Sequence, residues 1–226
     1  RPHVLSAEME SLLAQASEVM ASPSNTFGML NNADLEFPVI KDENGEEVQV
    51  THGRYIRFLE SSDRRVRHDA FKAVYDTYGK FKNTFASKLS GQVKKENFYA
   101  KVRNYKSARE AALSNNHIPE EVYDNLVRTV NDHLHLLHRY VSLRKKVLGV
   151  DELHMYDLYT PLVKDVQMEF TFDEAKDVVL KGLEPMGEDY LSVLKKAFTE
   201  RWIDAHENKG KRIGAYSSGA YGTNPY

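Results

Sequence analysis

The sequence contains no cysteine among its 226 residues. This absence excludes a disulfide framework, a thiolate nucleophile and a zinc site with sulfur ligands. The chain also lacks an uninterrupted apolar run of ~18 residues, which a membrane-spanning helix would need. It has no excess of either charge: 31 Lys and Arg stand against 33 Asp and Glu, for a formal net charge of −2. Because dedicated nucleic-acid binders usually carry a basic excess, we expect neither a membrane protein nor a nucleic-acid-binding protein.

Enough apolar residues are present to build a packed core. Hydrophobic residues make up 41% of the chain and charged residues 28%, which is a balance typical of a globular rather than a disordered protein. The chain begins at Arg1-Pro2-His3, with neither an initiator Met nor the apolar segment of a signal peptide. We therefore expect a segment cut from a longer chain.

Apolar residues at steps of three and four predict a long helix within residues 62–91. Ser62 is the predicted N-cap and Gly91 the predicted stop. The stripe comprises Val66, Ala70, Val74, Tyr78, Phe81, Phe85 and Leu89.

A second long helix is predicted over residues 119–148. Pro119 suits its first turn, and Gly149 follows its last residue. Shorter helices are predicted at 9–20, at 171–183 with a capping box from Thr171 to Glu174, and after Pro185. The stripe of the long helix comprises Val122, Leu126, Val130, Leu134, Leu137 and Val141.

Two segments break the helical pattern and predict β-hairpins. The first lies near 37–51, where β-prone residues flank Asn44-Gly45, a strong hairpin-turn signal. The second lies near 202–218, with a return strand rich in glycine and serine. We find no repeat and no linker, so we expect a mainly α fold in which residues 1–226 form a single, mostly helical unit with two small hairpins.

Histidines offer two candidate metal sites. His135 and His138 can share one helix face, but His133 lies about 200° from His135 around the axis, so the three cannot converge. A mixed, partly exposed helix face is the favoured interpretation. His206-Glu207 begins like a His-Glu-x-x-His zinc motif, but the fifth residue is Gly210, so we reject it.

Residues 94–109 interleave cations with aromatics, a combination that can serve nucleic acid through phosphate contacts and base stacking. The overall charge of −2 argues against that use. A solvated helix face is favoured.

The tail from Gly214 to Tyr226 is rich in glycine, serine and tyrosine. It matches neither a phosphate-binding loop nor a Gly-x-Ser-x-Gly elbow. Small residues in a strand indicate close approach of another backbone, and a free strand edge can pair with an extended peptide. An ordinary Gly/Ser loop is the equal alternative. The residues alone therefore supply no complete catalytic constellation.

Several long stretches resemble oligoendopeptidase F, of the thimet-oligopeptidase-like zinc metallopeptidases. The tail from Lys209 to Tyr226 is similar to the segment just upstream of that family's zinc motif. The other similar stretches are Arg1–Ser6, Met29–Asp34, Thr51–Tyr55, Phe98–Tyr105, Asn115–Tyr123 and Leu153–Tyr159.

This resemblance implies a cytoplasmic, mostly helical, zincin-like enzyme that hydrolyses short oligopeptides between two helical halves. The family holds zinc with the two histidines of His-Glu-x-x-His and a later glutamate, none of which has a counterpart here. We therefore expect zinc in the full-length enzyme, none bound by this fragment, and no catalytic or metal-ligating residue in this chain. The expected substrate contacts are Gly214, Ala215, Tyr216, Ser217, Ser218 and Gly219.

Two further expectations concern partners. A fragment of a larger enzyme should expose apolar surface that the rest of the enzyme covers. We therefore expect possible self-association through that surface. The alternative to a peptidase is a helical interaction module without enzymatic activity.

Overall fold

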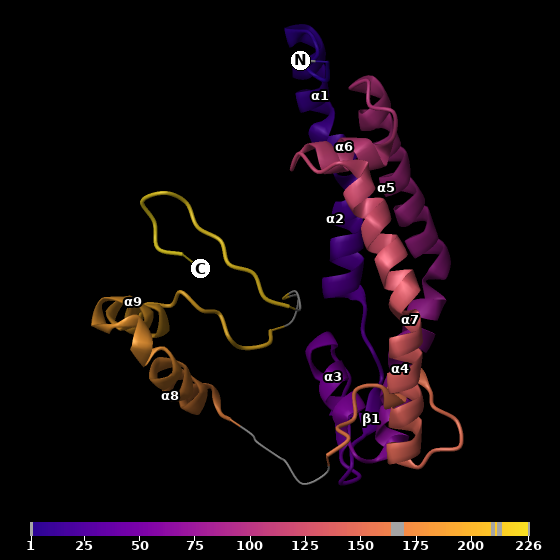
Figure 1. Ribbon diagram of the computed structural model, residues 1–226, viewed down its shortest axis with the longest axis vertical. Helices are drawn as coiled ribbons and strands as arrows, with labels where there is room; N and C mark the ends of the chain where they lie inside the picture. Colours follow the sequence, from indigo (N-terminus) through magenta and orange to yellow (C-terminus); the bar gives the residue numbers. More distant parts are fainter. Residues whose placement is uncertain (1, 164–169, 209–210, 212–213, 226) are drawn as a thin grey trace. The chain divides into compact units, whose positions relative to one another are not determined.

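The computed structural model describes residues 2–163, 170–208, 211 and 214–225, and most of these are helical. The chain divides into two compact units, Arg1–Leu162 and Val163–Tyr226. Figure 1 shows the helices of each unit, coloured along the sequence. The prediction of a mainly α fold is confirmed. That the two units form one domain stays a prediction.

The first unit is built from helices and one small sheet. Among the described residues, none of the helices is long and apolar enough to cross a membrane. The helical segments of this unit are α1 (Ala7–Met20), α2 (Ser22–Met29), the π-helix η1 (Leu30–Asp34), α3 (His52–Glu60), α4 (Arg64–Lys80), α5 (Lys82–Val102), α6 (Ala108–Ser114), α7 (Glu120–Leu148) and the 3₁₀ turn η2 (Met155–Asp157).

The helix predicted over 62–91 is in fact two helices, α4 and α5, which meet at Phe81. Asp63 rather than Ser62 is the N-cap, because its carboxylate accepts a hydrogen bond from the Arg65 amide at 2.8 Å. Gly91 does not end the helix. A Cβ there would lie 3.1 Å from Pro23 Cγ, so this glycine lets α2 approach α5 closely.

The long helix predicted over 119–148 is confirmed as α7. It runs for 29 residues to Leu148 and is capped by Gly149, which has a φ of 66° and so adopts the left-handed conformation that glycine favours. Most of its side chains are exposed.

The hairpin around Asn44-Gly45 is confirmed. Strands β1 (Val39–Lys41) and β2 (Glu47–Gln49) pair antiparallel, with Ile40 opposite Val48. Gly45 has a φ of 84°.

The core of the first unit lies where this hairpin and α3 pack on α4. Because Val66, Ala70 and Val74 repeat at steps of four, they present one buried face of α4 to the hairpin. The core comprises Leu35, Phe37, Ile40, Val50, Phe58, Val66, Ala70, Ala73 and Val74, with Val48, Tyr55, Tyr78, Phe81 and Phe85 packed against it.

The second unit contains α8 (Phe172–Gly182), the 3₁₀ turn η3 (Glu184–Met186) and α9 (Glu188–Thr199). The predicted capping box is present: the Glu174 amide donates to Thr171 Oγ1 at 3.2 Å, and the Thr171 amide donates to Glu174 Oε2 at 2.8 Å.

The hairpin predicted near 202–218 differs from what the structure describes. Residues 202–208, 211 and 214–218 form no strand, and residues 209–210 and 212–213 lie outside the described residues. A two-stranded hairpin is marginal without a face to pack on. The first hairpin buries Ile40 in the core, whereas the described residues 214–218 are all exposed.

Candidate functional site

The six predicted substrate contacts, Gly214 to Gly219, lie together in one exposed, irregular segment of the second unit. Gly214 has a φ of 96°. Within the described part of the chain, Ala215, Ser217 and Ser218 make no main-chain hydrogen bond to another residue. Their amides and carbonyls are therefore available to an added peptide strand.

Local turns bound this segment on both sides. Before it, Lys211 Nζ donates to the carbonyls of Asp204 and His206, both at 2.7 Å. After it, the Thr223 amide donates to the Ala220 carbonyl at 3.0 Å. These bonds fix the flanks and leave the segment between them in contact with solvent.

The histidines of α7 face solvent, and the rings of His133 and His135 bond to carbonyls of their own helix. His133 Nδ1 lies 2.7 Å from the Thr129 carbonyl, and His135 Nδ1 lies 3.0 Å from the Asp132 carbonyl. No group of three or more His, Cys, Asp or Glu residues among those described could hold a metal ion. We accordingly assign no zinc ligand to these residues.

Two basic residues of the 94–109 stretch, Arg103 at the end of α5 and Arg109 in α6, form ion pairs within the protein. Arg103 donates to both carboxylate oxygens of Glu10, at 2.8 and 2.7 Å. Arg109 donates to Glu120 at 2.6 Å and to Asp124 at 2.7 Å. These pairs attach α1 and α7 to the middle of the unit, a role that the sequence reading did not predict.

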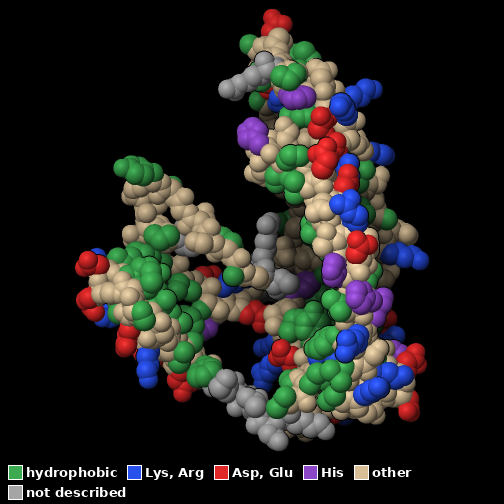
Figure 2. Space-filling model, viewed as in Figure 1, with side chains coloured by type: hydrophobic (Ala, Val, Ile, Leu, Met, Phe, Trp, Pro, Cys, Tyr) green, Lys and Arg blue, Asp and Glu red, His purple; other side chains and the backbone are tan. Residues whose placement is uncertain are grey.

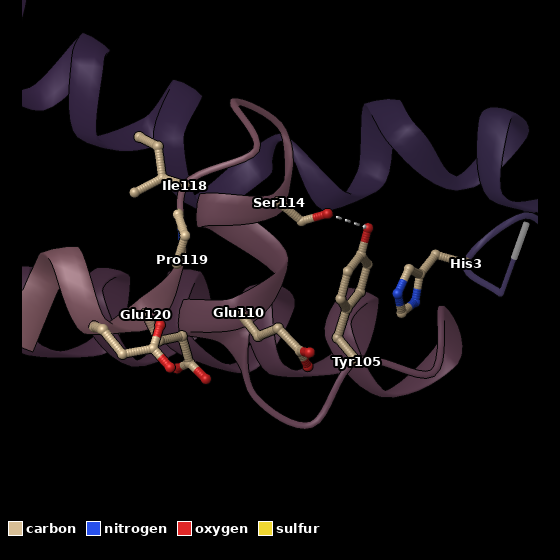
Figure 3. A pocket seen from close by; sticks show the side chains of 8 residues that line it. His3, Tyr105, Glu110, Ser114, Ile118, Pro119 and Glu120 are labelled. Carbon is tan, nitrogen blue, oxygen red and sulfur yellow. Dashed lines mark hydrogen bonds between the residues drawn. The ribbon is translucent and has the colours of Figure 1, made fainter.

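A pocket of about 260 Å³ lies between the N-terminal segment, α6 and the start of α7. The rings of His3 and Tyr105 stack at 3.7 Å, and the Tyr105 hydroxyl lies 3.2 Å from Ser114 Oγ (Figure 3). Of the acids that line it, Glu120 is paired with Arg109 and Glu110 accepts the Lys106 amide. Glu121, the third acid that lines the pocket, is exposed at the start of α7. Because the other two carboxylates have partners inside the protein, we assign the pocket no ligand.

Asp157 is the centre of a buried ion cluster that joins α4 to the segment after α7. Its side chain is fully buried and accepts hydrogen bonds from Arg64 at 3.2 and 2.9 Å and from Arg67 at 3.0 Å. The His154 amide donates to it at 3.0 Å. Burial raises the pKa of Asp157, but these hydrogen bonds outweigh burial and hold its pKa at about 2.

Arg144 of α7 completes this cluster through the backbone. Its Nη2 donates to the carbonyls of Asp157 and Thr160, at 3.0 and 2.6 Å. The Nε atoms of Arg67 and Arg144 are buried without a hydrogen-bond partner among the described residues. Asp157 lies inside the stretch Leu153–Tyr159 that carried part of the family resemblance, but no local spacing marks its role.

Matches to models of known protein families show which family this chain belongs to. The model of peptidase family M3 matches residues 57–225, most of the chain. The chain belongs to peptidase family M3. A second model, described as oligopeptidase F, matches residues 1–37, so the predicted resemblance is confirmed across both ends.

Relatives within family M3 match the whole chain. Oligopeptidase PepF of Bacillus subtilis is 69% identical over 226 residues, covering 100% of this chain and 34% of PepF. Group B oligopeptidase PepB of Streptococcus agalactiae is 55% identical, again over 100% of this chain and over 37% of PepB. The chain thus spans about a third of the length of these curated relatives.

A solved structure from the same family has a similar fold. The crystal structure of oligoendopeptidase-F from Enterococcus faecium matches with a TM-score of 0.71 and 56% identity, over 89% of this chain and 37% of that one. The helices and hairpin described above therefore correspond to part of an oligoendopeptidase F fold.

Proposed function

We propose that this chain is the internal part of a longer, zinc-dependent oligopeptidase that hydrolyses short peptides in the cytoplasm. The observation that carries the proposal is the 69% identity to an oligopeptidase over the full length of the chain. Zinc and the cytoplasmic location rest on the family resemblance. Membership of family M3 favours this function over a helical interaction module without activity.

Within that enzyme, the chain supplies a peptide-contacting segment rather than catalytic groups. The proposed contacts are the backbone amides and carbonyls of Gly214 to Gly219. Their support is the exposure of the segment and the absence of competing main-chain bonds at Ala215, Ser217 and Ser218 among the described residues. No step of peptide hydrolysis is assigned to a side chain of this chain.

The purified chain should not hydrolyse oligopeptides, even with added Zn²⁺, because its described residues offer no cluster of metal ligands. A longer protein, extended to the length of its relatives, should cleave the same peptides and lose activity with a chelator. Quenched fluorescent peptides measure both. Chelator-sensitive cleavage by the 226-residue chain would contradict the proposal, as would an inactive longer protein.

Replacing Ser217 with proline should weaken binding of a short peptide about fivefold. Proline removes one amide donor, and a hydrogen bond contributes about 1 kcal/mol net. Ser217→Ala keeps the amide and should bind as the unchanged chain does. Fluorescence anisotropy of a fluorescein-labelled, alanine-rich peptide measures the affinities, and equal effects of the two substitutions would exclude a main-chain contact there.

We also propose that the chain self-associates through exposed apolar side chains. The described residues leave many large apolar side chains exposed, including Leu126, Leu89 and Val19. Such surface favours association in water.

A further inference from the structure

The turn of the first hairpin carries an asparagine followed directly by a glycine, Asn44-Gly45, and both residues are exposed. The side-chain amide of Asn44 has no hydrogen-bond partner among the described residues. The turn is held instead by the Asp42 carboxylate, which accepts the main-chain amide of Asn44 at 2.8 Å and that of Glu46 at 2.9 Å. The Asn44 side chain is therefore open to water and to its own main chain.

The main-chain nitrogen of Gly45 is accessible to that side chain. Glycine has no Cβ to crowd the nitrogen, and no heavy atom outside the immediate chain neighbours lies within 4 Å of the place where a Cβ would stand, within the described part of the chain. The Gly45 amide donates to the Asp42 carbonyl at 3.2 Å, at the long end of the usual range. This single, long bond restrains the nitrogen only weakly.

Arg65 of α4 fixes the base of the turn and competes for the same carbonyl. Its guanidinium donates to the Asp42 carbonyl at 2.7 Å and to the Lys41 carbonyl at 2.9 Å. A short bond from a charged donor is stronger than a long bond from a neutral amide. Figure 2 shows acidic and basic side chains together at the end of the first unit that carries β1 and α4. The base of the turn is thus anchored, while its tip is in contact with water.

We propose that Asn44 is a site of spontaneous deamidation, in which the Gly45 nitrogen attacks the side-chain carbonyl carbon, Cγ, of Asn44. Hydroxide takes the proton of the Gly45 amide, and the new N–Cγ bond closes a cyclic imide. The side-chain nitrogen leaves as ammonia with a proton from water, which regenerates the hydroxide. No oxidant or reductant is involved, and asparagine is among the thermolabile residues of proteins.

Water then opens the cyclic imide at either of its carbonyls. Where the N–Cγ bond breaks, Asn44 becomes an aspartate with an unchanged main chain. Where the bond between the Gly45 nitrogen and the main-chain carbonyl carbon of Asn44 breaks, the product is isoaspartate. Its main chain runs through Cβ and Cγ and is longer by an extra carbon atom.

The two products affect the hairpin differently. Aspartate only adds a negative charge to residues 42–47, which already hold four acids and no base. Isoaspartate lengthens the turn between the two amides that Asp42 holds, so both bonds cannot be kept. The turn sets the register of a hairpin, and Ile40, which lies opposite Val48, is buried in the core. Isoaspartate therefore loosens the hairpin on the core of the first unit.

Incubation of the intact chain at neutral and mildly alkaline pH, followed by trypsin digestion and mass spectrometry, tests the site. The peptide of residues 42–54 should gain the mass difference between an amide and a carboxylic acid, as aspartate and isoaspartate products that separate by chromatography. The rate should rise in proportion to the hydroxide concentration, because the Gly45 amide must lose its proton.

Asn116 is the internal control, because it is also exposed and lies outside the helices, but is followed by His117. The side chain of His117 crowds the attacking nitrogen, so Asn116 should remain an amide over the same period. Equal conversion of the two asparagines would overturn the proposal. So would an Asn44 that stays unchanged, or one that reacts only when the chain is unfolded in urea.

Urea unfolding after incubation tests the effect on the hairpin. The incubated chain should unfold at a lower urea concentration than the fresh chain. Asn44→Gln, which would have to close a larger ring, should be unaffected by incubation, and Asn44→Asp should unfold close to the fresh chain. An Asn44→Asp chain as unstable as the incubated one would assign the loss to charge and overturn the role of isoaspartate. Neither experiment depends on peptide binding or hydrolysis, so each is independent of the proposed function.

Discussion

Replacing Asp157 with alanine should lower the free energy of unfolding of the first unit by about 3–5 kcal/mol, the range for breaking a buried ion pair. The side chain is fully buried and joins Arg64 and Arg67 of α4 to the segment after α7. Its removal leaves the Arg67 guanidinium, itself only 5% exposed, without a counter-charge. The cost arises chiefly from that uncompensated cation.

The same cluster predicts how stability depends on pH. Folding lowers the pKa of Asp157 from 3.8 to about 2, so the unfolded chain binds its proton more readily than the folded one. The contribution of the Asp157 carboxylate to the stability of the folded state is therefore fully present above the unfolded pKa. It is lost as pH falls through 3.8 towards 2. By linkage, the ionised Asp157 contributes about 2 kcal/mol to the free energy of unfolding in this pH-dependent way.

Urea unfolding followed by circular dichroism, at neutral pH and near pH 3, measures both effects. Asp76→Ala is the matched control, because Asp76 forms an exposed ion pair with Lys72 within α4, and it should cost less than about 1 kcal/mol. Asp157→Asn should remove the pH dependence assigned to this group. An Asp157→Ala chain as stable as the Asp76→Ala chain would show that the cluster contributes nothing.

Replacing Phe37 with alanine should destabilise the first unit by about 3–5 kcal/mol, the range for emptying a buried aromatic site. Phe37 is 5% exposed in the core beneath the hairpin. Its ring meets His52 edge-on at 4.9 Å and lies 5.9 Å from the Tyr78 ring. The substitution removes these contacts and leaves a cavity between α3, the hairpin and α4.

Phe98→Ala is the control for this substitution, because Phe98 lies in α5 with 40% of its surface exposed. Loss of its partly exposed ring should lower the free energy of unfolding much less than Phe37→Ala does. The two variants are compared by the same urea unfolding curves. Equal losses would mean that the residues around Phe37 collapse to fill the site.

Features fixed by a few neighbouring residues could be predicted from the sequence. Pro119 and Gly149 bound α7, Gly149 as expected and Pro119 as the N-cap just before the predicted first turn, because each acts through its own backbone conformation. Thr171 and Glu174 form their capping box for the same reason, since both partners lie within one helical turn. Asn44-Gly45 sets the first hairpin through the positive φ of the glycine.

Features that depend on distant partners could not be predicted in this way. Gly91 looked like a helix end, but its use depends on Pro23, which belongs to another helix. Nothing in the sequence near Asp157 distinguishes it from the other acids. Its role depends on Arg64 of α4 and Arg144 of α7, which lie in other helices and contact it only in the folded unit. The segment near 202–218 has turn residues like those of the first hairpin, but turn chemistry alone does not supply the packing face that a strand pair needs.

The Asp157 cluster also determines when the first unit can finish folding. Asp157 follows Arg64 by 93 residues and Arg67 by 90, so these bonds close a long loop, and contacts of that separation form slowly. During synthesis, α4 emerges with both guanidinium groups in water, and the hairpin core can assemble around it. Only after α7 and the turn that follows it have left the ribosome can Arg67 be buried beside its counter-charge and Arg64 be paired with the same carboxylate.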